Sequence, residues 1–305
     1  MDMRAAFGRT AAGLVYEDPR VALVLAEISV SAYFEETIAR HPERTVNIGI
    51  MEQTMVGVAA GFAMEGFYPI AHSLSPFMSE RPYEQLKLDF GYQGLGGTFV
   101  GSGGSYDYAA EGATHHAAAD ATLMLAIPGM EVLVPGHGSE VEALLRATYA
   151  NDRPTYMRTS MAVNAHGFEV APGRSEVLRR GASGTLVAFG PMLSRTLEAC
   201  EGLDVNVLYS TSLRPFDATA LASVVDHGTP VITIEPFYEG TAAMVVTEVL
   251  AHLPVRFASV GVPRAFIHGY GTWSDLDADV GLDAASVRRR ISDAIYPNAR
   301  NGSAS

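Results

Sequence analysis

The stretch that decides the predicted fold is VNIGIMEQTMVGVAAG, residues 46–61. Apolar residues alternate over 46–50, as in a strand, and recur at helical spacing over 55–62. Glu52 therefore lies where a strand passes into a helix. Ligands of open α/β sheets bind at such junctions, so we predict that Glu52 carries the chemistry of this protein.

Short apolar runs alternate with helical patterns along the rest of the chain, which is typical of parallel sheets. The other predicted strands are 21–25, 68–71, 98–100, 132–134, 155–158, 186–189, 205–209, 231–234 and 255–258. Residues 160–184 are richer in Gly, Pro, Ser and Asn, as expected of a linker. The prediction is an α/β protein with two doubly wound, mainly parallel-sheet domains, at residues 1–160 and 185–305, joined by a linker at 161–184.

Composition excludes several classes of protein. The 305 residues are 48% hydrophobic and 18% charged, which suffices for two domains with their own cores. A formal net charge of −13 argues against nucleic acid or an anionic membrane as a partner. The single cysteine, Cys200, excludes an internal disulfide framework. No export signal and no run of about 18 apolar residues is present, so a cytoplasmic location is expected.

Small residues mark one face of the helix predicted after Glu52. Gly57 and Gly61 stand four residues apart beside Ala60, so this face is nearly free of side chains. Another helix can approach such a face closely, and we predict a subunit interface there.

Two adjacent histidines, His115 and His116, form the other conspicuous polar pair. Neighbouring residues on a helix point in different directions, and no cysteine is near. No metal site is therefore predicted on this chain.

Two segments carry a family resemblance. Residues 44–66, RTVNIGIMEQTMVGVAAGFAMEG, resemble the segment of transketolase-type, thiamine-diphosphate-dependent enzymes that binds the aminopyrimidine of the cofactor. Residues 111–120, EGATHHAAAD, resemble the GPTH loop of those enzymes. The segments DPRVALVLAEIS, SPFMSERPYEQ, RPTYMR, SLRPFDATAL and VITIEP follow the order of the family. The resemblance covers nearly the whole chain, and it makes the two domains a pyrimidine-binding domain and a transketolase C-terminal-like domain.

The resemblance also implies a missing partner. Family members hold the diphosphate through Mg²⁺ on a separate domain with a GDG motif, and no GDG occurs here. The chain therefore resembles the C-terminal half of a split enzyme, whose N-terminal, diphosphate-binding half is another polypeptide. An α2β2 heterotetramer with self-dimerisation and a small-molecule substrate is expected, with neither nucleic acid nor membrane as a partner.

The resemblance assigns cofactor roles to five residues. Glu52 would bond the far ring nitrogen of the pyrimidine and promote the imino tautomer, a role that suits a carboxyl kept away from water. Phe77 would stack on the ring, with Tyr83 as second candidate, beside Ile50. Glu27 matches the acidic residue near the thiazolium. From the residues alone, a glutamate favoured by the helix dipole and aromatic residues of the core remain open alternatives.

Substrate roles follow in the same way. His115 matches the histidine that contacts the substrate as a donor or proton shuttle, and His116 is the second candidate. Arg158 matches a basic residue that binds the phosphate of the acceptor, and Arg81 could assist. Surface salt bridges remain the alternative for both arginines.

Some positions depart from the family pattern. Ala113 replaces the proline of GPTH, and Ala119 replaces a common acid. Gly103 and Gly104 stand near the place where sugar-phosphate transketolases have a histidine and an aspartate. An ordinary pentose-phosphate substrate is therefore in doubt.

The leading hypothesis is a transferase subunit that passes a two-carbon ketol unit from a ketose or 2-oxo acid to an aldehyde. The β subunit of the first component of a 2-oxo-acid dehydrogenase is the alternative, although the THH sequence favours transketolase. A non-catalytic partner subunit is the third possibility, and the presence of Glu52 argues against it.

Overall fold

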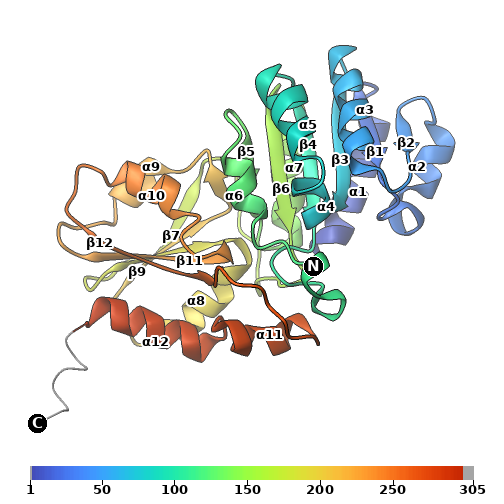
Figure 1. Cartoon of the computed structure of the whole chain (residues 1–305). Helices are drawn as coiled ribbons and strands as arrows, with labels where there is room; N and C mark the ends of the chain where they lie inside the picture. The colour runs from blue at the N-terminus through green and yellow to red at the C-terminus, as the bar shows by residue number, and fades with distance from the viewer. Residues whose placement is uncertain (1, 298–305) are drawn as a thin grey trace, which may run out of the picture.

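The computed structural model describes residues 2–297 and contains two α/β units, each built on one sheet (Figure 1). The predicted fold class is confirmed: both sheets are mainly parallel, and helices lie between most successive strands.

The first sheet has seven strands in the order β10-β5-β6-β4-β3-β1-β2. Its bounds are β1 Val21–Leu25, β2 Thr45–Asn47, β3 Tyr68–Leu74, β4 Gly97–Ser102, β5 Glu131–Leu133, β6 Pro154–Thr159 and β10 Ser212–Arg214. All pairs are parallel except β10 with β5. Because β10 comes from the second half of the sequence, the chain returns to the first sheet after it has begun the second.

Helices cover both faces of this sheet. They are α1 Met3–Glu17, the π-helix η1 Val30–Phe34, α2 Glu35–Arg40, α3 Glu52–Met64, α4 Ser75–Ser79, α5 Tyr83–Gln85, the π-helix η2 Leu86–Tyr92, the 3-10 helix η3 Ala109–Thr114, α6 Asp120–Leu125 and α7 Gly138–Thr148. Side chains of α1 and α7 form one core cluster, with residues such as Phe7 and Leu144. On the opposite face, Met55 of α3 and Phe90 of η2 join a second cluster.

The second sheet has five strands in the order β12-β11-β8-β9-β7. Its elements are β7 Ser175–Arg179, β8 Thr185–Phe189, the 3-10 helix η4 Gly190–Met192, α8 Leu193–Ala199, β9 Asn206–Ser210, α9 Ala218–Ala222, β11 Pro230–Tyr238, α10 Ala243–Val249, β12 Arg256–Val262, α11 Trp273–Val280 and α12 Ala284–Ile295. Helices α11 and α12 lie along one face, and α9 and α10 lie on the other (Figure 1). One core cluster runs from Phe99 in the first unit to Phe189 and Phe237 in the second, so the two units share a packed interface.

Two sequence predictions differ in detail from the structure. The strand before Glu52 ends at Asn47, because Gly49 has a φ of 77° and turns the chain towards α3. Within the segment predicted as a linker, residues 175–179 form β7, which pairs antiparallel with β9 at the edge of the second sheet. The domain boundaries themselves stay a prediction.

Helix α3 places Glu52 at the carboxyl edge of the first sheet. Met55 and Val56 are fully buried against the sheet, and burial of each stabilises this position by about 1.5–3 kcal/mol. On the opposite side, no described atom would lie within 4 Å of a Cβ added at Gly57 or Gly61. The small-residue face is therefore open to a partner, and the predicted interface there stays a prediction.

Candidate active site

Four predicted site residues gather where strands of the first sheet end. Glu27 follows β1, Glu52 follows β2, Phe77 lies in α4 directly after β3, and His115 lies in the loop region beyond β4. The carboxyl edge of a parallel sheet is the usual place for a ligand. Long-range pairing of the strands thus brings together residues that are up to 88 positions apart (115 − 27).

Glu52 is almost entirely buried, with 2% of its surface exposed. Its Oε1 accepts a hydrogen bond from Nη1 of Arg81 at 3.0 Å. The Arg81 guanidinium also lies over the Phe77 ring, with Cζ 3.6 Å from the ring centroid. Arg81, which was predicted to assist phosphate binding, therefore bridges the two principal predicted cofactor residues.

His115 completes this cluster. Its ring packs edge-on against Phe77, with 5.1 Å between the centroids. The Nδ1 atom lies 2.9 Å from the hydroxyl of Thr114, which orients the ring and leaves Nε2 for another partner. The structure therefore places an acid, a base and an aromatic surface side by side, an arrangement suited to proton transfer on a flat ring.

His116 faces a different environment. Burial and the adjacent His115 lower the pKa of His116, so its ring is neutral at pH 7. Its Nε2 is buried and has no hydrogen-bond partner within residues 2–297. Ile50 and Tyr83, the remaining cofactor candidates, differ in exposure: Ile50 is 68% exposed, whereas Tyr83 is half-buried against the core.

The loop that carries Glu27 is held by a network that the sequence analysis missed. Nδ2 of Asn47 donates to Oε2 of Glu27 at 2.9 Å, and the Glu27 amide donates to Oδ1 of Asn47 at 3.0 Å. Glu27 has a φ of 66°, a conformation that a non-glycine residue adopts only when its surroundings fix it. Asn47 therefore sets the position of the Glu27 carboxylate.

A second part of the network lies beneath the same loop. Nε of Arg4 donates to the hydroxyl of Ser29 at 2.9 Å, and that hydroxyl lies 2.8 Å from Nε2 of His72. Nδ1 of His72 lies 2.9 Å from the carbonyl of Val100 and must donate to it, because a carbonyl only accepts. Nε2 therefore accepts from Ser29. Burial lowers the pKa of His72 to about 3, so it stays neutral. The sequence indicates this network only through His72, a polar residue within the apolar run of β3.

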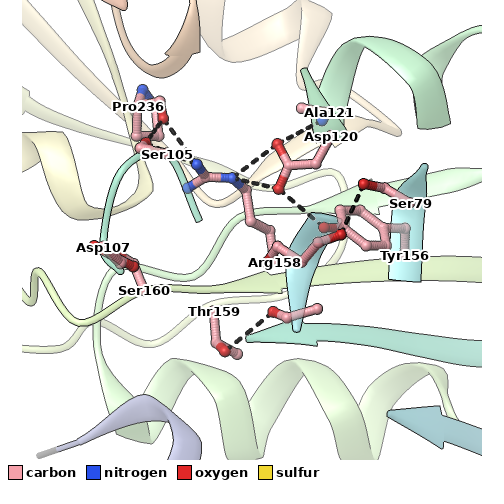
Figure 2. A network of polar contacts seen from close by, with 12 residues as sticks. Ser79, Ser105, Asp107, Asp120, Ala121, Tyr156, Arg158, Thr159, Ser160 and Pro236 are labelled. Carbon is pink, nitrogen blue, oxygen red and sulfur yellow. Dashed lines mark hydrogen bonds and ion pairs between the residues drawn. The ribbon is translucent and has the colours of Figure 1, made fainter. Parts of the chain in front are cut away.

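Arg158 lies away from solvent, at the contact between the two units (Figure 2). Its Nε lies 2.8 Å from Oδ2 of Asp120, and both side chains are fully buried. Its Nη2 donates to the hydroxyl of Ser105 and to the carbonyl of Pro236, each at 2.8 Å. A Cβ added at Gly104 would collide with the guanidinium, so Arg158 fills the space that this glycine leaves. This burial argues against the predicted contact with the phosphate of an acceptor.

Asp120 and Asp107 complete the buried polar group around Arg158. Tyr156 donates its hydroxyl to Asp120 at 2.9 Å, and the amide of Met161 donates to Asp107 at 2.8 Å. Burial raises the pKa of Asp107 to about 6. Neither aspartate was singled out from the sequence, since an isolated acid has no periodic signature.

Comparison with known proteins identifies the family to which the two domains belong. The model of the transketolase pyrimidine-binding domain matches residues 1–163, and that of the transketolase C-terminal domain matches residues 173–287. The two-domain fold is thus that of the pyrimidine-binding and C-terminal domains of transketolases. The chain belongs to the transketolase family, and the predicted resemblance is confirmed.

Three relatives show how much of such enzymes the chain spans. It is 39% identical to an uncharacterized 33.6 kDa protein in the fasciation locus of Rhodococcoides fascians, over 95% of this chain and 94% of that one. It is 30% identical to a 6-deoxy-6-sulfo-D-fructose transketolase subunit of Clostridium sp. (strain MSTE9), over 90% and 88%. It is 32% identical to a 1-deoxy-D-xylulose-5-phosphate synthase of Acidovorax ebreus (strain TPSY), over 94% of this chain but 47% of the synthase. The chain therefore spans about half the length of this synthase.

Solved structures give the same result. A split-gene transketolase described as an inactive β4 tetramer matches with a TM-score of 0.84 and 29% identity, over 97% of this chain and 98% of that chain. The transketolase of Campylobacter jejuni matches in fold with a TM-score of 0.77 and 18% identity, over 95% of this chain and 46% of that one. Within residues 2–297, no helix has the length and apolar character needed to cross a membrane.

Proposed function

We propose that this chain is the pyrimidine-binding subunit of a split, thiamine-diphosphate-dependent transketolase, which transfers a two-carbon ketol unit from a ketose or 2-oxo acid to an aldehyde. The observation that carries the proposal is the buried Glu52 carboxyl at the start of α3, which faces the Arg81 and Phe77 pair. Family membership implies dependence on thiamine diphosphate.

The residues present fit the pyrimidine end of that cofactor. The buried carboxyl of Glu52 can bond a ring nitrogen, and the Phe77 ring and the exposed Ile50 offer apolar contact to a flat heterocycle. When bound, the cofactor supplies the nucleophilic carbon that takes up the fragment of the donor. Glu52 would hold a proton at the pyrimidine nitrogen, which would favour the imino form of the cofactor.

Arg81 must move away from Glu52 and Phe77 before the pyrimidine can bind. It occupies one face of Phe77 and one oxygen of Glu52, the two partners that the pyrimidine needs. Its side chain is 43% exposed, so it has room to turn towards solvent, and the pyrimidine would replace its contact with the buried Glu52. Once the cofactor is bound, Nε2 of His115 would donate a proton to the carbonyl oxygen of the substrate or accept one from it.

Activity depends on a second polypeptide in this proposal. A diphosphate-binding subunit holds the Mg²⁺ and the diphosphate, and two copies of each subunit form an α2β2 heterotetramer. The open face of α3 at Gly57 and Gly61 and the exposed Met51 and Met64 support an interface beside Glu52. The split-gene transketolase whose β4 tetramer is inactive supports the requirement for a partner.

The test is co-expression with the product of the neighbouring gene, followed by assays of thiamine diphosphate binding and ketol transfer. We expect Glu52→Gln to lower ketol transfer at least 100-fold, because the proton at the pyrimidine nitrogen is lost. Glu142→Gln, at an exposed position of α7, is the matched control. Transfer that survives Glu52→Gln would refute the assigned role, and acylation of a lipoyl domain in place of ketol transfer would identify a dehydrogenase subunit.

A further inference from the structure

The segment 111–120, which carries His115 and His116, is called the histidine loop below. A cavity of about 100 Å³ lies between this loop of the first unit and the loop that follows β12 in the second. Glu80, His116 and Ala119 line it on one side, and Tyr238, Val262 and Ile267 line it on the other. The amide of Tyr238 donates to the carbonyl of Ala118 at 2.9 Å, which fixes one wall to the other. The cavity is therefore formed by both domains.

The cavity adjoins the site at two points. Glu80 directly precedes Arg81, and His116 directly follows His115. The ring of Tyr270 packs on Gly112, whose added Cβ would lie 2.8 Å from the Tyr270 Cε1 atom. This contact holds the loop after β12 against the histidine loop, so a substrate positioned at His115 has the cavity directly beside it.

The described residues that line the cavity provide no cationic side chain for a phosphate group. None of the described lining residues is Lys or Arg, and the charged group at the edge is the carboxyl of Glu80, with Asp120 nearby. Arg158 is held by Asp120 and is 1% exposed. A phosphate dianion inside the cavity would meet the like charge of the Glu80 carboxyl. Arg264 lies outside the lining, where its guanidinium packs over the Tyr238 ring and its Nε donates to the carbonyl of Glu239.

The lining favours an apolar group with one hydrogen-bonding atom. Alanine, valine and isoleucine side chains form most of the surface, and the buried Nε2 of His116 has no partner in the described chain. An unsatisfied buried polar atom costs about 1–3 kcal/mol, which the carbonyl oxygen of a ligand whose alkyl end fills the cavity can recover at His116. Cavities of about 150 Å³ hold a benzene ring, so this smaller one fits a group of about three or four carbons.

On this basis, and resting on the proposed transketolase function, we propose that the cavity receives the alkyl end of an uncharged, short-chain aliphatic aldehyde, which is the acceptor in place of a sugar phosphate. In the transfer, the donor fragment would form a carbon–carbon bond to the aldehyde carbon, and the aldehyde oxygen would take a proton from a general acid such as His115 and become a hydroxyl. The bond between the fragment and the cofactor would break as the hydroxyl of the fragment loses its proton and becomes the ketone, so no oxidant is needed. The alkyl end does not react and only positions the aldehyde.

The test uses the co-expressed holoenzyme. Donor cleavage is measured without acceptor, by ferricyanide oxidation of the bound fragment, and acceptor kcat/KM is then compared for butanal and glyceraldehyde 3-phosphate. We expect butanal to be at least 10-fold better. Ile267→Arg, normalised to its own donor cleavage, should lower the kcat/KM for butanal at least 10-fold. The same change at the exposed Leu197 of α8 is the control, with less than a twofold effect expected.

Binding gives a second readout that needs no turnover. Butan-1-ol, an unreactive analogue, should shift the NMR signals of the His116 ring in the wild-type chain and not in Ile267→Arg. A preference for glyceraldehyde 3-phosphate, or an Ile267→Arg variant that keeps the butanal rate, overturns the acceptor assignment. Absence of donor cleavage with butan-1-ol still bound at His116 would instead overturn the proposed function and leave the cavity as an alkyl site.

Discussion

Replacement of Asp120 by asparagine is the most direct test of the buried contact between the two units. Asp120 and Arg158 are both fully buried, with 2.8 Å between Oδ2 and Nε. Asp120→Asn leaves the guanidinium in the interior without its counter-ion, which costs about 3–5 kcal/mol. With a urea m-value of about 3 kcal/mol per molar, the unfolding midpoint should fall by more than about 1 M.

Urea unfolding followed by circular dichroism and by fluorescence of Trp273 measures this loss. Glu36→Gln removes the exposed ion pair with Arg40, where both side chains are more than 60% exposed, and should change the free energy of unfolding by less than about 1 kcal/mol. The double change Asp120→Leu with Arg158→Met should recover most of the lost stability, because it removes both charges. An unchanged midpoint for Asp120→Asn would refute the inference that Arg158 is a buried structural residue.

Two further changes test the same region. The pKa of Asp107, raised to about 6 by burial, means that its protonated form stabilises the fold: this stability is complete below the unfolded pKa of about 4 and is lost as the pH rises through about 6. Wild-type protein should lose about 2 kcal/mol of unfolding free energy between pH 4 and pH 7 through Asp107, and Asp107→Asn should abolish that loss. An unaltered pH dependence would contradict this. Gly104→Ala should cost about 1–3 kcal/mol in thermal unfolding, because the new methyl group meets the Arg158 guanidinium, whereas Gly57→Ala on the open face of α3 should stabilise the isolated chain by up to about 1 kcal/mol. Equal effects of the two alanines would show that Gly104 is not closely packed.

The buried arginine changes the interpretation of the departures from the family pattern. From the sequence, Gly103 and Gly104 were a reason to doubt a pentose-phosphate substrate. In the structure, Gly104 provides the space into which Arg158 folds. Gly104 has no side chain, and Arg158 is buried in the space that this leaves. Both features belong to one packing arrangement, and both favour the proposed acceptor without phosphate.

The fold class could be predicted from the amino-acid sequence alone, and the sequence also predicts where the site lies. Apolar periodicity is a local property of the chain, so it predicted β1 at its observed bounds and placed Glu52 at the start of α3. The order of the quoted segments sufficed to indicate the family, because each segment can be recognised without knowledge of its spatial neighbours.

Which side chains contact one another became known from the tertiary structure and could not be predicted from the sequence. Arg81 and Arg158 are both isolated arginines in the sequence, yet one lies at the surface on Glu52 and Phe77, and the other lies buried on Asp120. Arg158 and Asp120 are 38 residues apart in the sequence. The walls of the cavity between the histidine loop and the loop after β12 come from different domains. Such contacts depend on strand order and on packing between sheets, and no local pattern of residues encodes either, so the chemistry of the acceptor could be addressed only after the chain was folded.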